Sequence, residues 1–185
     1  MRIFYNLFLM LVLISIPSKS IASYAQSDIS SNGVVVTQHY LATEIGENIL
    51  AQGGNAYDAA IAVGFALAVV LPRAGNIGGG GFMVIYDKEA NDTYAIDYRE
   101  KAPAASFRDM YLDENGEFDI LKSTFGYSAI GVPGTVHGFW SVHQRFGSLP
   151  WADLIQPSIM LAERGFMMSD YMAETLSNYF EKMSY

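Results

Sequence analysis

Three ionisable residues near the middle of the chain have types and a spacing that could bind or transform a substrate. Asp97, Arg99 and Glu100 lie in the segment "AIDYREKAP". An arginine guanidinium offers a planar fork of donors that matches a carboxylate with two parallel hydrogen bonds. Arg99 could therefore hold the carboxylate of a ligand, or it could form a surface ion pair with Asp97 or Glu100. The two acids also have the residue types of a glycosidase pair, but at this spacing they are better suited to orienting Arg99.

Other side chains of catalytic type have no partner at a useful spacing. His39, His137 and His143 do not form a metal-binding pattern, and His137 and His143 are off one helical face, so core or surface roles are favoured. Ser128 and Ser141 have no evident base and lack the glycine pattern of a nucleophile elbow. Cysteine is absent, which excludes thiol catalysis and thiolate metal sites within this chain.

A run of four glycines, Gly78–Gly81, precedes the acidic and basic residues. A phosphate-binding loop needs a strand, then glycines, then a helix whose N-terminus faces the phosphate. Here the order is helix, glycines, strand, and no Gly-Lys-Ser or Gly-Lys-Thr sequence follows. The run is therefore expected to let the backbone pass close to another backbone or to a ligand. A tight crossing in the core and a part in a binding site remain equally open.

The elements that must position these residues follow from periodicity and capping signals. Apolar residues at helical spacing predict a helix that Gly53 and Gly54 end, and Asn55 with Asp58 predicts the start of a second helix that ends at Pro72. This second helix is apolar nearly all round. A membrane span is the alternative, but its length, its alanines and Asp58 favour a helix buried against a sheet. Further elements are predicted as strands over 33–37, 82–87 and 93–99 and as helices over 135–146, 151–156, 157–164 and from 170 onwards.

Composition limits the class of protein. Of the 185 residues 51% are apolar, and the formal net charge is −8. Residues 1–25 have the charge, apolar run and small residues of a signal peptide, so a secreted, periplasmic or extracellular chain is expected to start after them. An uncleaved membrane anchor is the alternative. Removing those residues takes away Arg2 and Lys19 and no acid, so the net charge falls to −10. Such an acidic domain is a poor nucleic-acid binder.

Several segments in a fixed order resemble the large subunit of bacterial γ-glutamyltranspeptidases, also called glutathione hydrolases. They are "LATEIGENILAQGGNAYDAAIAVGFALAVVLP", "GNIGGGGFMVIYD", "AIDYREKAPAAS", "GVPGTVHGFW" and "FGSLPWADLIQPSIMLAERGF". The resemblance covers residues 33 to the late 170s. It implies an α/β (α+β) fold, namely part of the four-layer αββα sandwich of the N-terminal-nucleophile hydrolases. Residues 26–185 would be the N-terminal portion of the large-subunit domain.

The resemblance also implies an activity and one site residue. Family members cleave γ-glutamyl amide bonds and pass the γ-glutamyl group to water, amino acids or peptides, without a metal or organic cofactor. The arginine of the "DYREKAP" segment in this family grips the α-carboxylate of the γ-glutamyl group, and it matches Arg99 here. The threonine nucleophile, freed by self-cleavage as the first residue of a small subunit, has no counterpart in this chain. The chain is therefore expected to be an inactive N-terminal fragment with no catalytic residue of its own.

Alternatives remain at this point. Within the same fold, cephalosporin acylases and poly-γ-glutamate depolymerases compete with glutathione hydrolases. From another class, the chain could be a non-catalytic remnant that is unfolded or binds a partner. A remnant ending at Tyr185 is expected to expose the apolar faces of 59–70 and to aggregate. No stable membrane span is expected.

Overall fold

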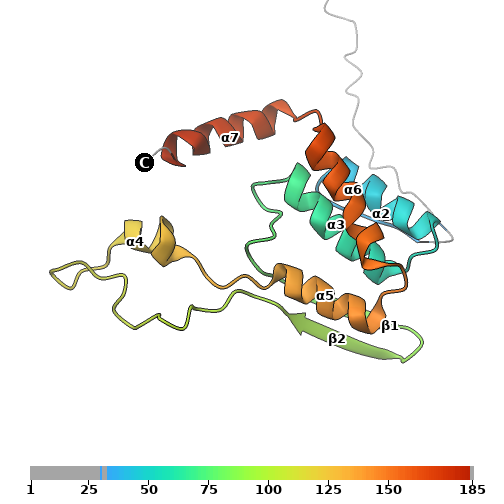
Figure 1. The fold of residues 1–185 in the computed structure, drawn as a ribbon, viewed down its shortest axis with the longest axis horizontal. Coiled ribbons are helices and arrows are strands. Elements are labelled where there is room, and N and C mark those ends of the chain that lie inside the picture. Colours follow the sequence, from blue (N-terminus) through green and yellow to red (C-terminus); the bar gives the residue numbers. More distant parts are fainter. Residues whose placement is uncertain (1–29, 31–32, 184–185) are drawn as a thin grey trace, which may run out of the picture. The chain divides into compact units, whose positions relative to one another are not determined.

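The computed structural model describes Ser30 and residues 33–183, and residues 33–183 belong to one compact unit covering residues 32–185. The predicted signal peptide lies outside the described residues. The elements, in chain order, are α2 (Tyr40–Ala51), α3 (Ala56–Val70), β1 (Phe82–Asp87), β2 (Asp92–Asp97), α4 (Ile120–Thr124), the 3₁₀ turn η1 (Tyr127–Ala129), α5 (Thr135–Phe146), α6 (Trp151–Arg164) and α7 (Asp170–Met183). Figure 1 shows α2 and α6 beside α3, and α5 beside the β1–β2 hairpin. The α+β class predicted from the sequence is confirmed.

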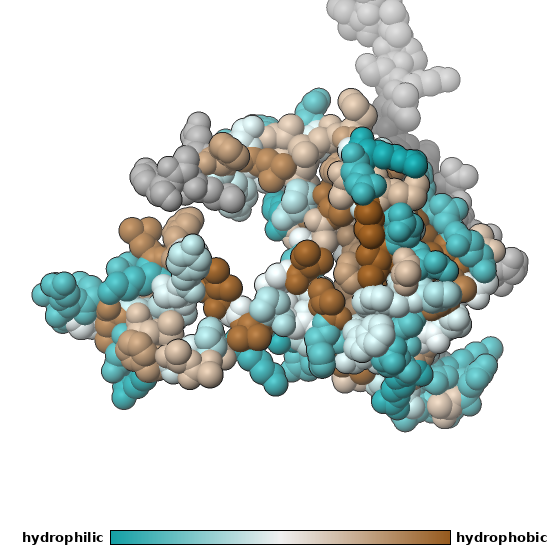
Figure 2. Space-filling view, in the orientation of Figure 1, coloured by the Kyte–Doolittle hydropathy of each residue, from teal (hydrophilic) through white to brown (hydrophobic). Residues whose placement is uncertain are grey.

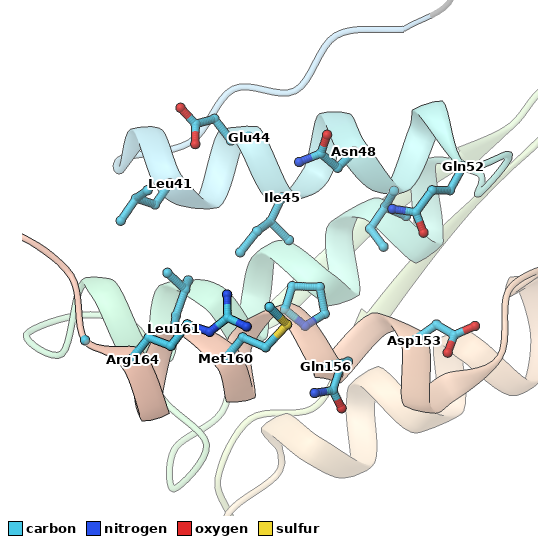
Figure 3. Close-up of a pocket in the computed structure, with 13 residues that line it drawn as sticks. Leu41, Glu44, Ile45, Asn48, Gln52, Asp153, Gln156, Met160, Leu161 and Arg164 are labelled. Atoms are coloured by element: carbon cyan, nitrogen blue, oxygen red, sulfur yellow. The ribbon is translucent and has the colours of Figure 1, made fainter.

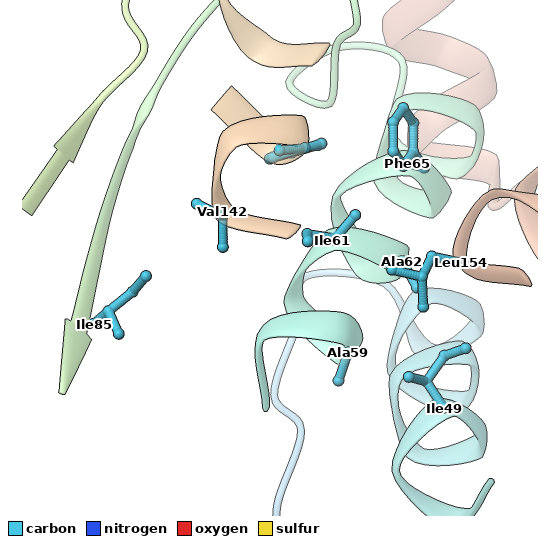
Figure 4. Packing of buried hydrophobic residues seen from close by; sticks show 9 residues of the cluster. Ile49, Ala59, Ile61, Ala62, Phe65, Ile85, Val142 and Leu154 are labelled. Atoms are coloured by element: carbon cyan, nitrogen blue, oxygen red, sulfur yellow. The ribbon is translucent and has the colours of Figure 1, made fainter. Parts of the chain in front are cut away.

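Helix α3 is the centre of the core. Its small residues allow α2, α5 and α6 to pack closely around it, and Ile61, Ala62 and Ala66 have no exposed surface. The core cluster joins α3 to Ile85 of β1 and Leu154 of α6 (Figure 4). The prediction that this helix is buried in the core is therefore confirmed. No described helix is both long and apolar enough to cross a bilayer.

The N-terminus of α3 is tied to a distant part of the chain by a buried carboxylate. Asn55 and Asp58 form the predicted cap as a complete capping box. Asp58 has no exposed surface, and it also accepts hydrogen bonds from the backbone N–H groups of Ser148 and Leu149 and from the Ser148 hydroxyl. These residues connect α5 to α6. The Asp58 carboxylate therefore fixes α3 against the α5–α6 connection.

The hairpin forms where alternating residues predict it. β1 pairs with β2 in antiparallel register, with Phe82 opposite Asp97 and Asp87 opposite Asp92. Asn91 takes a left-handed conformation, φ 51°, in the turn, which asparagine adopts more readily than most residues. One face of the hairpin packs on the helices through alternate residues, and Arg99 follows at the end of β2 on the opposite side. β2 ends at Asp97, two residues before the predicted strand end, so Arg99 lies just beyond the half-buried hairpin.

Three sequence expectations are wrong. Gly33–Thr37 has no regular secondary structure and does not pair as a strand with any described segment. Val34 and Val36 are 61% and 86% exposed, while Val35 packs towards α2 and α3. A β-branched run becomes a strand only when a neighbour takes its hydrogen bonds. The apolar face of Ala59–Val70 is also not exposed, because α2, α5 and α6 cover it.

The third difference is in α6, which is one helix and not two. Pro157 lies inside it and lacks the N–H that would pair with the Asp153 carbonyl. The helix continues because Leu154 and Ser158, on either side of the proline, are buried against α3. Gly165, with φ 74°, ends the helix as predicted. The packing of α6 against α3 therefore outweighs the helix-breaking effect of Pro157.

Candidate functional site

Arg99 is an exposed side chain on a fixed piece of backbone. Its side chain is 69% exposed, and its Nε lies 3.8 Å from Glu100 Oε2. The guanidinium carbon lies 6.0 Å from the centre of the Phe82 ring on β1. An ion pair this long and exposed stabilises the fold little. The donors of the guanidinium are therefore available to an anionic ligand at little cost.

The two neighbouring acids have different roles. Asp97 does not pair with the guanidinium, because its Oδ1 accepts a hydrogen bond from the backbone N–H of Arg99 at 3.0 Å. This bond fixes the turn by which the chain leaves β2. Glu100 alone makes the weak ion pair with Arg99. The interpretation that the acids orient Arg99 is therefore supported by two different contacts, one to backbone and one to side chain.

Glycines from two segments enclose the backbone that carries Arg99. A Cβ on Gly80 would lie 2.7 Å from the Arg99 Cα, the Glu100 N and the Tyr98 O. A Cβ on Gly134 would collide with the Tyr98 carbonyl. We call the three residues Tyr98–Glu100 the arginine segment. It packs against two backbones that approach it closely only because both lack side chains there.

The packing answers the question raised by the glycine run. The run is a tight crossing of backbones, and the backbone that it crosses is the one carrying Arg99. The two interpretations left open by the sequence are therefore compatible, because the close approach is itself what supports the candidate binding residue. Gly131 makes a similar approach, since a Cβ there would lie 3.0 Å from Glu100 Cβ.

Tyr98 anchors the arginine segment to the core. Its N–H donates to the Gly81 carbonyl at 3.1 Å, and its ring meets Phe139 of α5 edge to face, with ring centres 5.7 Å apart. The ring lies against Gly138, where a Cβ would collide with it. Burial raises the pKa of the Tyr98 phenol above its ordinary value. Tyr98 therefore stays neutral at physiological pH, and Arg99 projects from a segment whose preceding residue is locked in place.

A cavity of about 430 Å³ opens beside the arginine segment. Its lining consists of Arg99, Glu100, Lys101, Ala102, Pro103, Ser106, Met110, Tyr111, Ala129, Ile130 and Gly131. Two cations, Arg99 and Lys101, border it. Glu100 is the one acid in this lining, and backbone pairing with Val132 fixes Lys101 in place. The cavity has the polarity to accept a small anionic ligand, but among the described residues it offers no nucleophile paired with a base.

The weaker candidates have structural roles. His39 caps α2 through its Nδ1. His143 stacks on Trp140 and meets Trp151 edge to face, while its Nε2 pairs with the Leu149 carbonyl. His137 is exposed on α5. Within the described part of the chain no three metal-binding side chains come together. The prediction of core and surface histidines is confirmed.

Both candidate serines are engaged with backbone carbonyls. The Ser128 hydroxyl donates to Lys122, and the Ser141 hydroxyl donates to His137 one helical turn earlier. Neither serine has a hydrogen-bonded base, so neither has the arrangement of an activated nucleophile.

A second groove, of about 540 Å³, lies between α2 and α6 (Figure 3). Ile45, Met160 and Leu161 form its apolar part, and Glu44 and Arg164 stand at its rim. In the space-filling view, apolar residues gather along this part of the helices with hydrophilic residues around them (Figure 2). It does not include Arg99 and contains no arrangement that could carry out a reaction.

Sequence reasoning found Arg99 and missed the residues that hold it. Gly134 and Gly138 enclose the arginine segment from α5, and Tyr98 fills the space that they leave. A sequence signal for this was present, because two glycines four positions apart at the start of a helix leave one helical face bare. The partner of that face lay in another segment and could not be identified from the spacing.

Comparison with known proteins gives consistent matches. The family profile described as gamma-glutamyltranspeptidase matches residues 42–185. The glutathione hydrolase proenzyme of Bacillus subtilis (strain 168) is 47% identical over 169 residues, which cover 91% of this chain and 29% of that protein. The glutathione hydrolase proenzyme of Escherichia coli (strain K12) is 48% identical over 150 residues, covering 81% and 26% respectively. The crystal structure of Helicobacter pylori γ-glutamyltranspeptidase matches with a TM-score of 0.81 at 46% identity, covering 84% of this chain and 44% of that chain.

The arrangement of the helices and the hairpin is thus that of an N-terminal-nucleophile hydrolase fold. Within this class the chain belongs to the γ-glutamyltranspeptidase family, because the family profile covers most of its length. The resemblance seen in the sequence is confirmed. The chain spans 29% and 26% of the lengths of the two curated relatives, so it corresponds to part of such a protein.

Proposed function

We propose that this chain is the N-terminal part of a γ-glutamyltransferase or glutathione hydrolase, and that Arg99 binds the α-carboxylate of the γ-glutamyl substrate. The complete protein would cleave γ-glutamyl amide bonds, as in glutathione, and pass the γ-glutamyl group to water, amino acids or peptides. The names of the curated relatives, glutathione hydrolase proenzymes, support this activity.

The observation that carries the proposal is the mounting of Arg99. The arginine segment is enclosed by Gly80 and Gly134, while the guanidinium itself is exposed beside a cavity of about 430 Å³. A fixed backbone with an exposed planar cation is suited to recognising a carboxylate in one orientation. A surface ion pair would not need a backbone packed closely against glycines from two separate segments.

We propose that catalysis itself belongs to residues that this chain does not contain. In the complete protein a threonine, made N-terminal by self-cleavage of a proenzyme, would attack the γ-glutamyl carbonyl with its own α-amine as base. The small subunit released in that cleavage would be the partner of residues 26–185. Neither a metal nor an organic cofactor enters this scheme.

Export is a further part of the proposal. Residues 1–25 have the pattern of a signal peptide, so the mature protein would be periplasmic or extracellular. N-terminal sequencing of the protein recovered from the periplasm or medium tests this. A mature chain that begins near Ser23 or Gln26 supports export with cleavage, and a membrane-bound protein that keeps its first residues contradicts it.

The substrate-binding role of Arg99 is tested by kinetics on the complete protein. With a chromogenic γ-glutamyl anilide, Arg99→Ala is expected to raise KM by about 10- to 100-fold, the effect of losing a charge-assisted hydrogen-bond pair. Arg99→Lys keeps the charge but loses the bidentate geometry, so it is expected to recover only part of the affinity.

The matched control is Arg108→Ala. Arg108 lies 3.7 Å from the carboxylate of its neighbour Asp109 and is 96% exposed, so it repeats the neighbouring ion pair of Arg99 outside the cavity. KM is expected to stay at the wild-type value in this variant. An Arg99→Ala variant with unchanged KM would refute the proposal.

The other candidates make different predictions. When glutathione competes with a second substrate, a cephalosporin acylase would prefer a glutaryl-cephalosporin, and a poly-γ-glutamate depolymerase would prefer a γ-linked polymer. A non-catalytic remnant is distinguished by the DNA that follows codon 185. An in-frame continuation containing a Thr-Thr-His-like motif supports the enzyme, and a genuine stop codon supports the remnant.

A further inference from the structure

A polar side chain outside the cavity ties the glycine run to the start of α5. Asn76 is half-buried in the loop before the glycines. Its Oδ1 accepts two hydrogen bonds, one from the Gly79 N–H at 2.9 Å and one from the Thr135 hydroxyl at 2.7 Å. Thr135 is 59 positions away and only 3% exposed. One amide oxygen thus joins two segments that are distant in sequence.

A second pair of bonds reinforces this connection. The Gly79 carbonyl accepts from the N–H groups of Gly134, at 2.8 Å, and Thr135, at 3.1 Å. Helix α5 has no side-chain cap of its own, since its N-cap residue is Gly134. The glycine loop therefore supplies the acceptor that the free N–H groups at the start of a helix require. We call Asn76, Gly79 and Thr135 the clasp.

The clasp holds together the two backbones that enclose the arginine segment. Gly80 follows Gly79 in the glycine run, and Gly134 precedes Thr135 at the start of α5. A Cβ on Gly80 would lie 2.7 Å from Arg99 Cα, and one on Gly134 would collide with the Tyr98 carbonyl. If the clasp loosens, the two backbones separate and the arginine segment loses its close contact with them.

We infer that Asn76 is a positioning residue for Arg99, acting through the clasp and without contact with the substrate. This inference rests on the proposed function of Arg99 as the substrate-binding residue. Asn76 is not among the residues that line the cavity beside Arg99. Its effect on substrate binding would therefore come only from the placement of the arginine segment.

Kinetics on the complete protein test the inference with two ways of breaking the clasp. Asn76→Ala removes the shared acceptor, and Thr135→Val removes one donor while keeping the side-chain shape. Both are expected to raise KM for the γ-glutamyl anilide, by about tenfold for Asn76→Ala and less for Thr135→Val, because small displacements of an orienting group are costly. kcat is expected to change by less than about twofold, because the nucleophile is not affected.

Thr135→Ser is the matched variant that keeps the hydroxyl, and it is expected to retain the wild-type KM. Leu154→Ala is the control for a purely structural effect, because it truncates a fully buried core side chain that lies outside the cavity beside Arg99. That change is expected to lower stability, measured by urea unfolding, without changing KM. If Asn76→Ala does not fold, the comparison of Thr135→Val with Thr135→Ser decides the question.

The decisive result is a double-mutant cycle with Arg99→Ala. If Asn76 acts through Arg99, adding Asn76→Ala to an Arg99→Ala protein leaves KM unchanged. Effects on KM that multiply in the double mutant overturn the inference, as does a KM of Asn76→Ala equal to that of the wild type. An Arg99→Ala protein that itself keeps the wild-type KM refutes the proposed function instead, so the two failures are distinguishable.

Discussion

Substituting one glycine of the run with alanine tests whether close backbone packing holds Arg99. A Cβ on Gly80 would lie 2.7 Å from three backbone atoms of the arginine segment, whereas ordinary van der Waals contact begins at 3.4 Å. The difference is 0.7 Å, and the two backbones must separate by about that distance. Backbone atoms cannot rotate away as a flexible side chain can, so the strain is expected to cost about 1–3 kcal/mol of stability.

The same displacement moves Arg99 relative to the rest of the site. Because a misplacement of about 1 Å can reduce activity by about 100-fold, Gly80→Ala is expected to lower kcat/KM for a γ-glutamyl anilide by about 10- to 100-fold. The assay compares it with Gly78→Ala in the same run. A Cβ on Gly78 meets no atom within 4 Å, so that variant is expected to behave as the wild type.

Two results would refute this reasoning. If Gly80→Ala and Gly78→Ala have the same kcat/KM, the close approach does not position Arg99. If Gly80→Ala loses stability but keeps its kcat/KM, the glycines serve only the fold, and the enclosure of the arginine segment has no part in substrate binding.

Three further predictions concern the fold of the complete protein. Asp58→Ala leaves several buried donors without an acceptor and is expected to lower the free energy of unfolding by about 3 kcal/mol or more. Asp153 is exposed, so Asp153→Ala is expected to change the free energy of unfolding by less than about 0.5 kcal/mol. Equal free energies of unfolding for the two variants, measured in urea, would contradict this prediction. Burial raises the folded-state pKa of Tyr98 above the unfolded value of 10.0, so its contribution to stability is complete below pH 10.0 and is lost as pH rises through the folded-state pKa. Tyr98→Phe is expected to flatten the fall of stability above that pH, and an unchanged pH profile would contradict this. Pro157→Ala restores a backbone donor inside α6 and is expected to raise stability by about 1 kcal/mol, which a lower urea midpoint would disprove.

Local signals were sufficient for the elements whose residues satisfy one another. Asn55 and Asp58 predict the start of α3, because both partners of the capping box lie within four residues of sequence. Alternation in β1 and β2 predicts their hairpin for the same reason, since each strand is the other's neighbour in sequence. Residues 33–37 could not be predicted in this way, because their β-branched pattern needs a pairing partner that the described chain does not provide.

The same distinction between local and distant partners applies to the residues of the candidate site. Arg99 was identifiable from its residue type, its place after a strand and the family resemblance. Asn76 and Thr135 were not, because their hydrogen bond joins positions 59 apart, and neither position has a local pattern that predicts the other. The four glycines in a row indicated a close backbone approach, because such a run carries a conformational-entropy cost that needs a structural reason. Only the structure identifies the segment against which they pack.

The proposed function requires that Arg99, held by the glycine-packed backbone, binds the α-carboxylate of a γ-linked glutamyl group. The decisive measurement is a crystal structure of the complete protein with glutamate bound. Two guanidinium nitrogens of Arg99 are expected within about 3 Å of the two α-carboxylate oxygens, with the arginine segment unmoved. A bound glutamate whose α-carboxylate is held by other residues, with the Arg99 side chain turned towards Glu100, would contradict it.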